Sequence, residues 1–146
     1  MKFTCSTTSL NKAIQTVQRA ISSKPTAPIF SGIHIIAAEN ILYVQAMDLN
    51  MAISCTVESN TEANGEIVVS AKHFSELMRK LPGETVTIIK NKEEKTISVK
   101  SAKSDFQLLL MNEDDYPKFP EFNPEKQIVL EDEKIKELIK KTIFSC

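Results

Sequence analysis

The sequence contains the same short pattern twice, at the start and near the end. Residues 2–22 and residues 127–146 each form an alternating apolar run followed by an amphipathic helical run. At an offset of 125 positions, apolar residues align: Phe3 with Ile128, Leu10 with Ile135 and Ile14 with Ile139. A repeat of this length is a whole domain, and one strand with one helix cannot bury its own apolar face. We therefore expect one domain over residues 1–122 and the truncated start of a second over 123–146, within a longer repetitive protein.

The composition is that of a globular domain. The 146 residues, 42% of them apolar and 25% charged, are enough to bury a full core. No apolar run is long enough to span a bilayer and no signal-peptide pattern is present, so we expect no membrane association. The cysteines, Cys5, Cys55 and Cys146, lie far apart. This spacing argues against a zinc site and a disulfide framework, and it favours the reducing cytoplasm.

The net charge of −1 conceals an asymmetry along the chain. Lys2, Lys12, Arg19 and Lys24 are the only formal charges in the first 38 residues. From Glu113 onward, nine acids stand against six lysines. A protein that is nearly neutral overall can still present one basic face to a polyanion. The charge count alone does not establish nucleic-acid binding.

Apolar periodicity predicts two helices among many antiparallel strands. The first helix is predicted over residues 10–21, with Ser9 as its N-cap, and the second over residues 71–81. Strands are predicted over residues 2–7, 32–38, 41–47, 51–58, 66–69, 85–90, 96–100 and 104–111. The pair Glu39-Asn40 predicts a tight hairpin, and the Pro-rich, acidic residues 112–124 predict an interdomain linker. This order is typical of an α+β domain.

No set of residues suggests catalysis. The sequence lacks a nucleophile elbow, a P-loop and a zincin motif, and the histidines, His34 and His73, lie in unrelated contexts. The acids at 113–115 lack the ligand spacing of a cation site and are interpreted as solvated. Asp48 is interpreted as an acceptor for backbone donors at a strand end. We expect no enzymatic activity, no metal and no cofactor.

Six segments, in the same order, resemble the N-terminal domain of the bacterial DNA polymerase III beta subunit, or sliding clamp, family. They are Met1-Lys2-Phe3-Thr4, residues 19–29, Ala46-Met47-Asp48-Leu49, Arg79-Lys80-Leu81-Pro82, Ser104-Asp105-Phe106 and Asp115-Tyr116-Pro117. Residues 138–145 resemble the first helix of that family's second domain. The resemblance implies a DNA-clamp domain with two helices packed against two antiparallel sheets. It also implies three such domains per chain, and two chains closed head to tail around duplex DNA with the helices on the inner wall.

A clamp has to hold DNA without stopping on it, and phosphate contacts achieve this because they carry no sequence information. The resemblance assigns this role to the basic loop at Lys24 and to the inward faces of the helices. The remaining DNA-binding candidates are Lys12, Gln15, Arg19, Lys72, Arg79 and Lys80. The alternative interpretation is that these are ordinary solvated faces of two amphipathic helices.

The strand predicted at 104–111 places Phe106, Leu108 and Leu110 on one face, which by periodicity alone indicates core. The resemblance instead makes this an edge strand that pairs with the third domain of a partner chain. It implies the following interface residues: Phe106, Leu108, Lys72, His73 and Lys103. Asp105 stands where relatives often carry a basic residue, so an ion pair between this position and a partner chain is not expected here. An unpaired edge favours self-association.

The predicted function is a non-enzymatic fragment of the replicative processivity factor that tethers DNA polymerase III to duplex DNA. In the full-length family the partners are a second copy, the polymerase catalytic subunit and the clamp loader. Nucleotidyltransferase activity belongs to a different subunit of that complex. The alternative is a non-enzymatic α+β protein-interaction domain, which would fit cations scattered over several faces. A small hydrolase or transferase would instead require a deep pocket with convergent polar groups.

Overall fold

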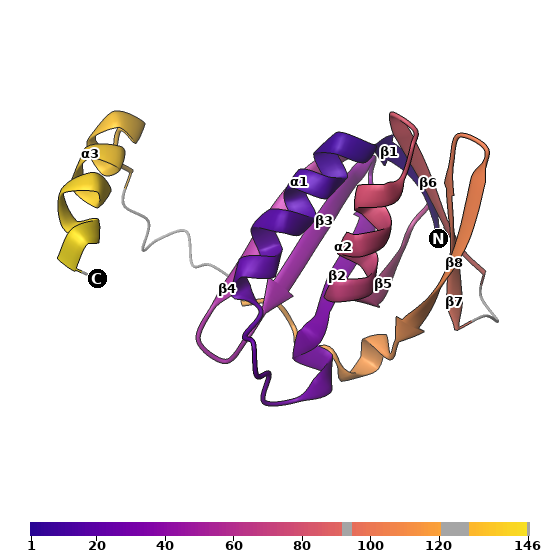
Figure 1. Ribbon diagram of the computed structural model, residues 1–146, viewed down its shortest axis with the longest axis horizontal. Helices are drawn as coiled ribbons and strands as arrows, with labels where there is room; N and C mark the ends of the chain where they lie inside the picture. Colours follow the sequence, from indigo (N-terminus) through magenta and orange to yellow (C-terminus); the bar gives the residue numbers. More distant parts are fainter. Residues whose placement is uncertain (92–94, 121–128, 146) are drawn as a thin grey trace.

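The computed structural model describes residues 1–91, 95–120 and 129–145. The strands are β1 (Lys2–Ser6), β2 (Gly32–Ala38), β3 (Ile41–Met47), β4 (Ala52–Ala63), β5 (Gly65–Ser70), β6 (Thr85–Lys90), β7 (Thr96–Ser101) and β8 (Ser104–Met111). The α-helices are α1 (Thr7–Val17), α2 (Ala71–Lys80) and α3 (Asp132–Thr142). Short 3-10 turns are η1 (Gln18–Ala20), η2 (Pro28–Ser31), η3 (Glu113–Asp115) and η5 (Ile143–Ser145). Figure 1 shows their arrangement.

The strands form one closed antiparallel barrel in the order β1-β4-β3-β2-β5-β8-β7-β6. Residues 52–58 of β4 pair with β3, and its residues 59–63 pair with β1. Likewise, residues 104–109 of β8 pair with β7, and residues 110–111 pair with β5. The family resemblance implies two sheets, and that detail is not confirmed, because these two strands each belong to both halves of one closed barrel.

The predicted hairpin between β2 and β3 is confirmed. Ala38 pairs with Ile41, so Glu39 and Asn40 form a two-residue turn. Their φ angles of 52° and 65° are both positive, as the type I′ turn that suits the strand twist requires.

Both predicted amphipathic helices are confirmed, and they lie side by side across one face of the barrel (Figure 1). Leu10 and Ile14 of α1 and Phe74 of α2 are fully buried, in the same core as Phe3 and Ile88 of the strands. Burying each such side chain contributes about 1.5–3 kcal/mol. The apolar stripes therefore fix which helical faces remain in solvent.

The start of α1 differs from the prediction. Ser6, not Ser9, is the N-cap: its side-chain oxygen accepts the backbone N–H of Ser9 at 3.3 Å. The chain passes from β1 into the helix without a loop, so Thr7 and Thr8 join the first turn. The helix ends at Val17 and continues as η1, whereas the sequence predicts a single helix to residue 21.

The chain after β8 returns along the barrel. Residues 112–119, which we call the strap, include η3 and a largely buried Tyr116. Tyr116 packs with Met47 and Val68, and the half-buried Phe119 joins this cluster. The predicted linker is described as far as residue 120, and its residues 121–124 lie outside the described parts of the chain.

The repeat is visible in the helices. Helix α1 runs from Thr7 to Val17, and α3 runs from Asp132 to Thr142, so both ends of α3 lie 125 positions after those of α1. The 3-10 turns η1 and η5 follow the two helices at the same offset. All residues of α3 are exposed, including the apolar Ile135, Leu138 and Ile139. Val129 and Leu130 belong to no strand, and the rest of the alternating run before them lies outside the described residues.

Candidate nucleic-acid interface

The predicted DNA-binding side chains all remain in solvent. Six of them lie on α1, η1 or α2, and Lys24 lies in the loop between η1 and η2. The exposed candidates are Lys12, Gln15, Arg19, Lys24, Lys72, Arg79 and Lys80. Their exposure follows from the packing of the opposite helical faces into the core.

Four of these residues line one seam between the two helices. Lys12, Gln15 and Arg79 line a hollow of about 370 Å³ between α1 and the end of α2. Lys72 and Arg79 line a second hollow of about 360 Å³ near the start of α2. Arg79 borders both, so the hollows follow a single line, which we call the interhelical seam.

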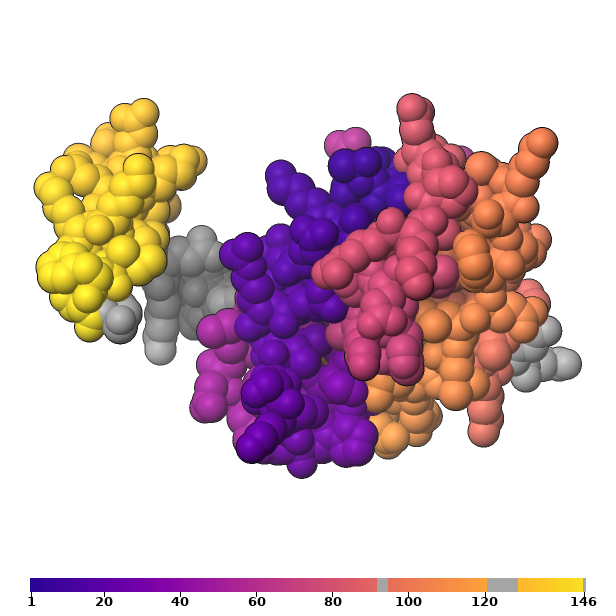
Figure 2. Space-filling view, in the orientation of Figure 1, coloured from indigo at the N-terminus to yellow at the C-terminus, as the bar shows by residue number. Residues whose placement is uncertain are grey.

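A hydrogen bond ties the helices together along this seam. The side-chain amide of Gln18 donates to the backbone carbonyl of Ala71 at 3.0 Å. This contact joins the end of α1 to the beginning of α2, which holds the seam residues of both helices at a fixed spacing. In Figure 2 the indigo atoms of the N-terminal region and the rose atoms of the region around α2 lie next to one another on the face shown.

The other candidates extend beyond the seam. Arg19 lies in η1, which continues α1, and Lys80 follows Arg79 at the end of α2. Lys24 lies further along the chain, and its backbone N–H donates to the Ser22 hydroxyl at 3.2 Å. Neither hollow is lined by these three residues.

One acid, Glu76, lines the same hollow as Lys72 and Arg79, but among the described residues it forms no ion pair with the cations of this face. Within the described residues, no ion pair includes Lys12, Lys72 or Arg79, nor do Arg19, Lys24 or Lys80 form one. Lysines of the strands differ, because Lys2 pairs with Glu62 at 2.7 Å and Lys100 pairs with Asp105 at 3.3 Å. The helical face therefore keeps its positive charge available for an anion.

The part of the chain that contains β2 to β5 carries acids and no Lys or Arg. No Lys or Arg stands between Lys24 and Lys72, a stretch that includes all of β2 to β5. The formal charges in this stretch are the acids Glu39, Asp48, Glu58, Glu62 and Glu66. This gap between cations is a sequence signal that marks the charge-segregated faces of the domain, and the composition totals do not reveal it.

Strand β8 presents an open edge. Residues 104–109 pair with β7, and in the described chain no strand pairs with their other side. Phe106 is 38% exposed and Leu109 is 69% exposed, while Leu108 and Leu110 pack partly against the core. Leu109 was not among the predicted interface residues because it lies on the opposite strand face.

The remaining interface candidates are not joined to β8 by polar contacts. Lys72, His73 and Lys103 are exposed, and no hydrogen bond or ion pair among the described residues links them to that strand. Asp105 accepts a hydrogen bond from Ser98 at 2.7 Å. This bond, and then the Lys100 charge, lower the pKa of Asp105. The Asp105 charge is therefore satisfied within its own hairpin.

The acidic candidates have local partners. Asp48 accepts the backbone N–H of Leu49 at 2.7 Å, as interpreted from the sequence. Glu113, which was interpreted as solvated, is instead partly buried and pairs with Lys90. Among residues 1–91, 95–120 and 129–145, no group of three or more potential metal ligands gathers. None of the helices described is long and apolar enough to cross a membrane.

Comparison with known proteins identifies relatives across nearly the whole chain. Residues 1–120 match the family model described as DNA polymerase III beta subunit, N-terminal domain. Over 99% of its length the chain is 32% identical to the beta sliding clamp of Bacillus subtilis, of which it spans 40%. It is 30% identical to a Vibrio harveyi beta sliding clamp sequence, of which it covers 100%. The crystal structure of the Bacillus subtilis sliding clamp matches with a TM-score of 0.90 at 31% identity, covering 99% of this chain and 40% of that one.

Proposed function

Because this chain belongs to the family of DNA polymerase III beta subunits, we propose that it forms the first domain of a sliding clamp. In this proposal it is a non-catalytic, cytoplasmic part of the processivity factor that holds DNA polymerase on duplex DNA. The chain spans 40% of its Bacillus subtilis relative, so a whole clamp requires further units. The domain boundary near residue 122 belongs to the same proposal.

The interhelical seam is the observation that carries this function. Lys12, Lys72 and Arg79 line it without ion pairs among the described residues, and the stretch that contains β2 to β5 carries acids but no Lys or Arg. Mobile cations around a phosphate backbone supply affinity without base readout, which suits a protein that moves along DNA. We propose that Gln15, Arg19, Lys24 and Lys80 extend this contact.

Two open edges support assembly into a ring. Residues 104–109 of β8 pair only with β7, and residues 52–58 of β4 pair only with β3 in the described chain. Successive units that join one edge to the other would make a head-to-tail contact, which closes into a ring when the rotation allows. We propose that Phe106 and Leu108 lie in such a contact with a partner chain, flanked by Lys72, His73 and Lys103.

The polymerase catalytic subunit and the clamp loader are the proposed protein partners of the complete clamp. In the family that the chain resembles, the pocket for partner peptides is formed mainly by the second and third domains, so we assign no residue of this chain to it. The alternative of a general protein-interaction domain required cations on scattered faces. Of the residues that decide between the two, Lys72 lies in the seam with Lys12 and Arg79, whereas Arg19 and Lys24 line neither hollow; the shared seam favours the clamp.

Charge reversal on the seam tests the proposal. The 146-residue chain should bind a labelled duplex of about 20 base pairs only weakly, and binding should weaken steeply as salt rises from about 25 to 150 mM. The double variant Lys12→Glu/Arg79→Glu should bind at least ~10-fold more weakly at the lower salt, with a shallower salt dependence. Fluorescence anisotropy measures both quantities.

The matched control is Lys95→Glu/Lys118→Glu, which changes the same charge at exposed lysines away from the seam and from the proposed partner contact. Its binding should stay close to that of the parent chain. An equal loss in both double variants would show only a general charge effect and contradict the proposed interface. Tight, salt-resistant binding of a linear duplex would also contradict it, because a clamp depends on closure around DNA.

A further inference from the structure

The strap is held to the barrel at two separated points. Its residues 112–119 follow β8 and run across strands of the barrel, where Tyr116 is 8% exposed. The cluster around Tyr116 includes Met47, Val68 and the half-buried Phe119. Apolar packing holds the middle and the end of the strap. An ion pair at its start and a ring contact at its middle add to this packing.

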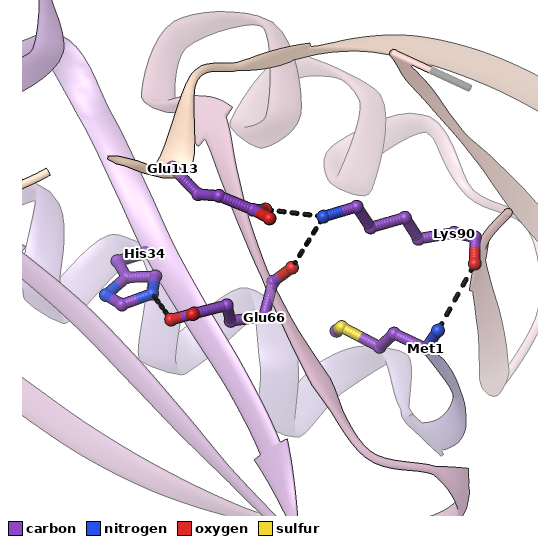
Figure 3. Close-up of polar contacts among 5 residues, drawn as sticks. All are labelled: Met1, His34, Glu66, Lys90 and Glu113. Carbon is purple, nitrogen blue, oxygen red and sulfur yellow. Dashed lines mark hydrogen bonds and ion pairs between the residues drawn. The ribbon is translucent and has the colours of Figure 1, made fainter. Parts of the chain in front are cut away.

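The first anchor is an ion pair at the start of the strap. The carboxylate of Glu113 meets the ammonium of Lys90, the last residue of β6 (Figure 3). The same ammonium donates to the backbone carbonyl of Glu66 at 3.2 Å. Lys90 is itself fixed by its backbone, because its N–H donates to the carbonyl of Met1 at 2.9 Å and its carbonyl accepts from the Met1 nitrogen at 3.2 Å.

The second anchor is a ring contact in the middle of the strap. The centroids of the His34 and Tyr116 rings lie 5.0 Å apart, with the rings tilted by 48°. His34 is oriented from its other side, since its Nε2 lies 2.8 Å from Oε2 of Glu66 (Figure 3). The imidazole is therefore held between a carboxylate of β5 and the aromatic ring of the strap.

Glu66 takes part in both anchors. Its backbone carbonyl accepts from Lys90, and its side chain meets His34. It lies on β5 where that strand has no pairing with β8, since those strands pair only at Val68–Met111 and Val69–Leu110. We propose that Glu66 couples the two anchors into one clasp, which fixes the strap on the barrel and sets the direction in which the chain leaves the domain.

The clasp has a mechanical consequence that single contacts would not have. One partly exposed ion pair shifts an opening equilibrium by no more than about fivefold. If the strap opens as a unit, however, each anchor lowers the opening equilibrium constant for every residue of the strap. The factor from each anchor then multiplies with the factor from burial of the Tyr116 ring. The inference stands on contacts within this chain; its importance for the angle between successive units rests on the proposed function.

Limited trypsin digestion of the 146-residue chain tests the clasp. Lys118 lies in the strap beyond Tyr116, five residues from Glu113, so its cleavage reports release of the far end. Glu113→Gln and Glu66→Ala should each speed cleavage after Lys118 about threefold. Tyr116→Leu should speed it at least tenfold, because ring contact and buried area are lost together.

Asp114→Asn is the matched control, since Asp114 is exposed and has no ion pair among the described residues. It should leave cleavage after Lys118 unchanged. Cleavage after Lys103, in the β7–β8 turn, serves as the internal reference. The clasp is refuted if Glu113→Gln leaves Lys118 unaffected, or if all variants speed cleavage equally at both lysines, which would indicate global unfolding. Neither result bears on DNA binding, so failure here is distinct from failure of the proposed function.

Discussion

Ala102 adopts a backbone conformation that its side chain does not favour. In the β7–β8 turn its φ is 51°, a left-handed value that costs an ordinary L-residue about 1–2 kcal/mol. Asn40 meets the same demand in the β2–β3 turn with less strain, because Asn tolerates this region. The two hairpins thus differ at the residue level although both are tight.

We predict that Ala102→Gly raises the free energy of unfolding by about 0.5–1 kcal/mol, because glycine removes the Cβ strain at a modest entropic cost. Denaturant unfolding followed by circular dichroism measures this change. Lys103→Gly in the same turn is the control. Its φ is not positive, so the substitution should destabilise by about 0.5 kcal/mol. Equal effects at both positions would contradict the strain argument.

Single residues show where sequence reasoning succeeds and where it fails. The exposure of Lys12, Gln15 and Arg79 follows from helical periodicity, because their neighbours Ile14 and Met78 must be buried. The N-cap does not follow, since Ser9 directly precedes the apolar Leu10 whereas Ser6 precedes Thr7, and only the end of β1 shows that Ser6 is the cap. The partners of Glu66 were not predictable either, as His34 and Lys90 come from distant strands.

Among the elements, β8 combines a free edge with exposed apolar side chains. Residues 104–109 have one strand neighbour, and Phe106 and Leu109 lie in solvent. Such an edge offers unpaired backbone groups to another chain. The pairing with β5 at the end of β8 shows that the edge opens only along part of the strand.

We predict that the chain self-associates through this edge. Phe106→Lys should raise the dissociation constant for self-association at least ~10-fold, because an edge lysine opposes strand addition. Tyr43→Lys is the control: Tyr43 is also 38% exposed, but it lies on β3, which has strand neighbours on both sides. Sedimentation velocity over a concentration series measures the effect. A chain that stays monomeric at high concentration, or an equal effect of both variants, would argue against the edge.

The predictability of each element depends on how local its signal is. The structure matches the predicted bounds of β2, β3, β6 and β8, whose alternation and turns are written in adjacent residues. Strand β4 runs five residues past its predicted end, to Ala63. That extension is polar and pairs with β1, and such a long-range partner leaves no periodic trace in the sequence.

At the scale of the molecule, the barrel and its strap are complete within residues 1–120. The residues of α3 are exposed, and among the described residues the core clusters contain none beyond Phe119. The closure of the barrel was not predictable from patterns, because it depends on β4 and β8 each changing partners partway along.

We predict that a chain ending at residue 120 melts within about 2 °C of the 146-residue chain, because α3 contributes no buried surface to the domain. Thermal unfolding by calorimetry measures the difference. A chain ending at residue 111 is the control, since it also loses Tyr116, Phe119 and the Glu113 ion pair. It should melt at least ~5 °C lower. A large loss in the 120-residue chain would assign α3 a structural role in the domain.

The cation-free stretch from Pro25 to Ala71 gives the domain an electric polarity across its thickness. In the proposed clamp, a duplex that approaches the acidic strands would be repelled, whereas the helical side would attract it. A ring of such units would bind DNA poorly on its outer strands. A duplex inside the ring would therefore have no competing binding surface outside it.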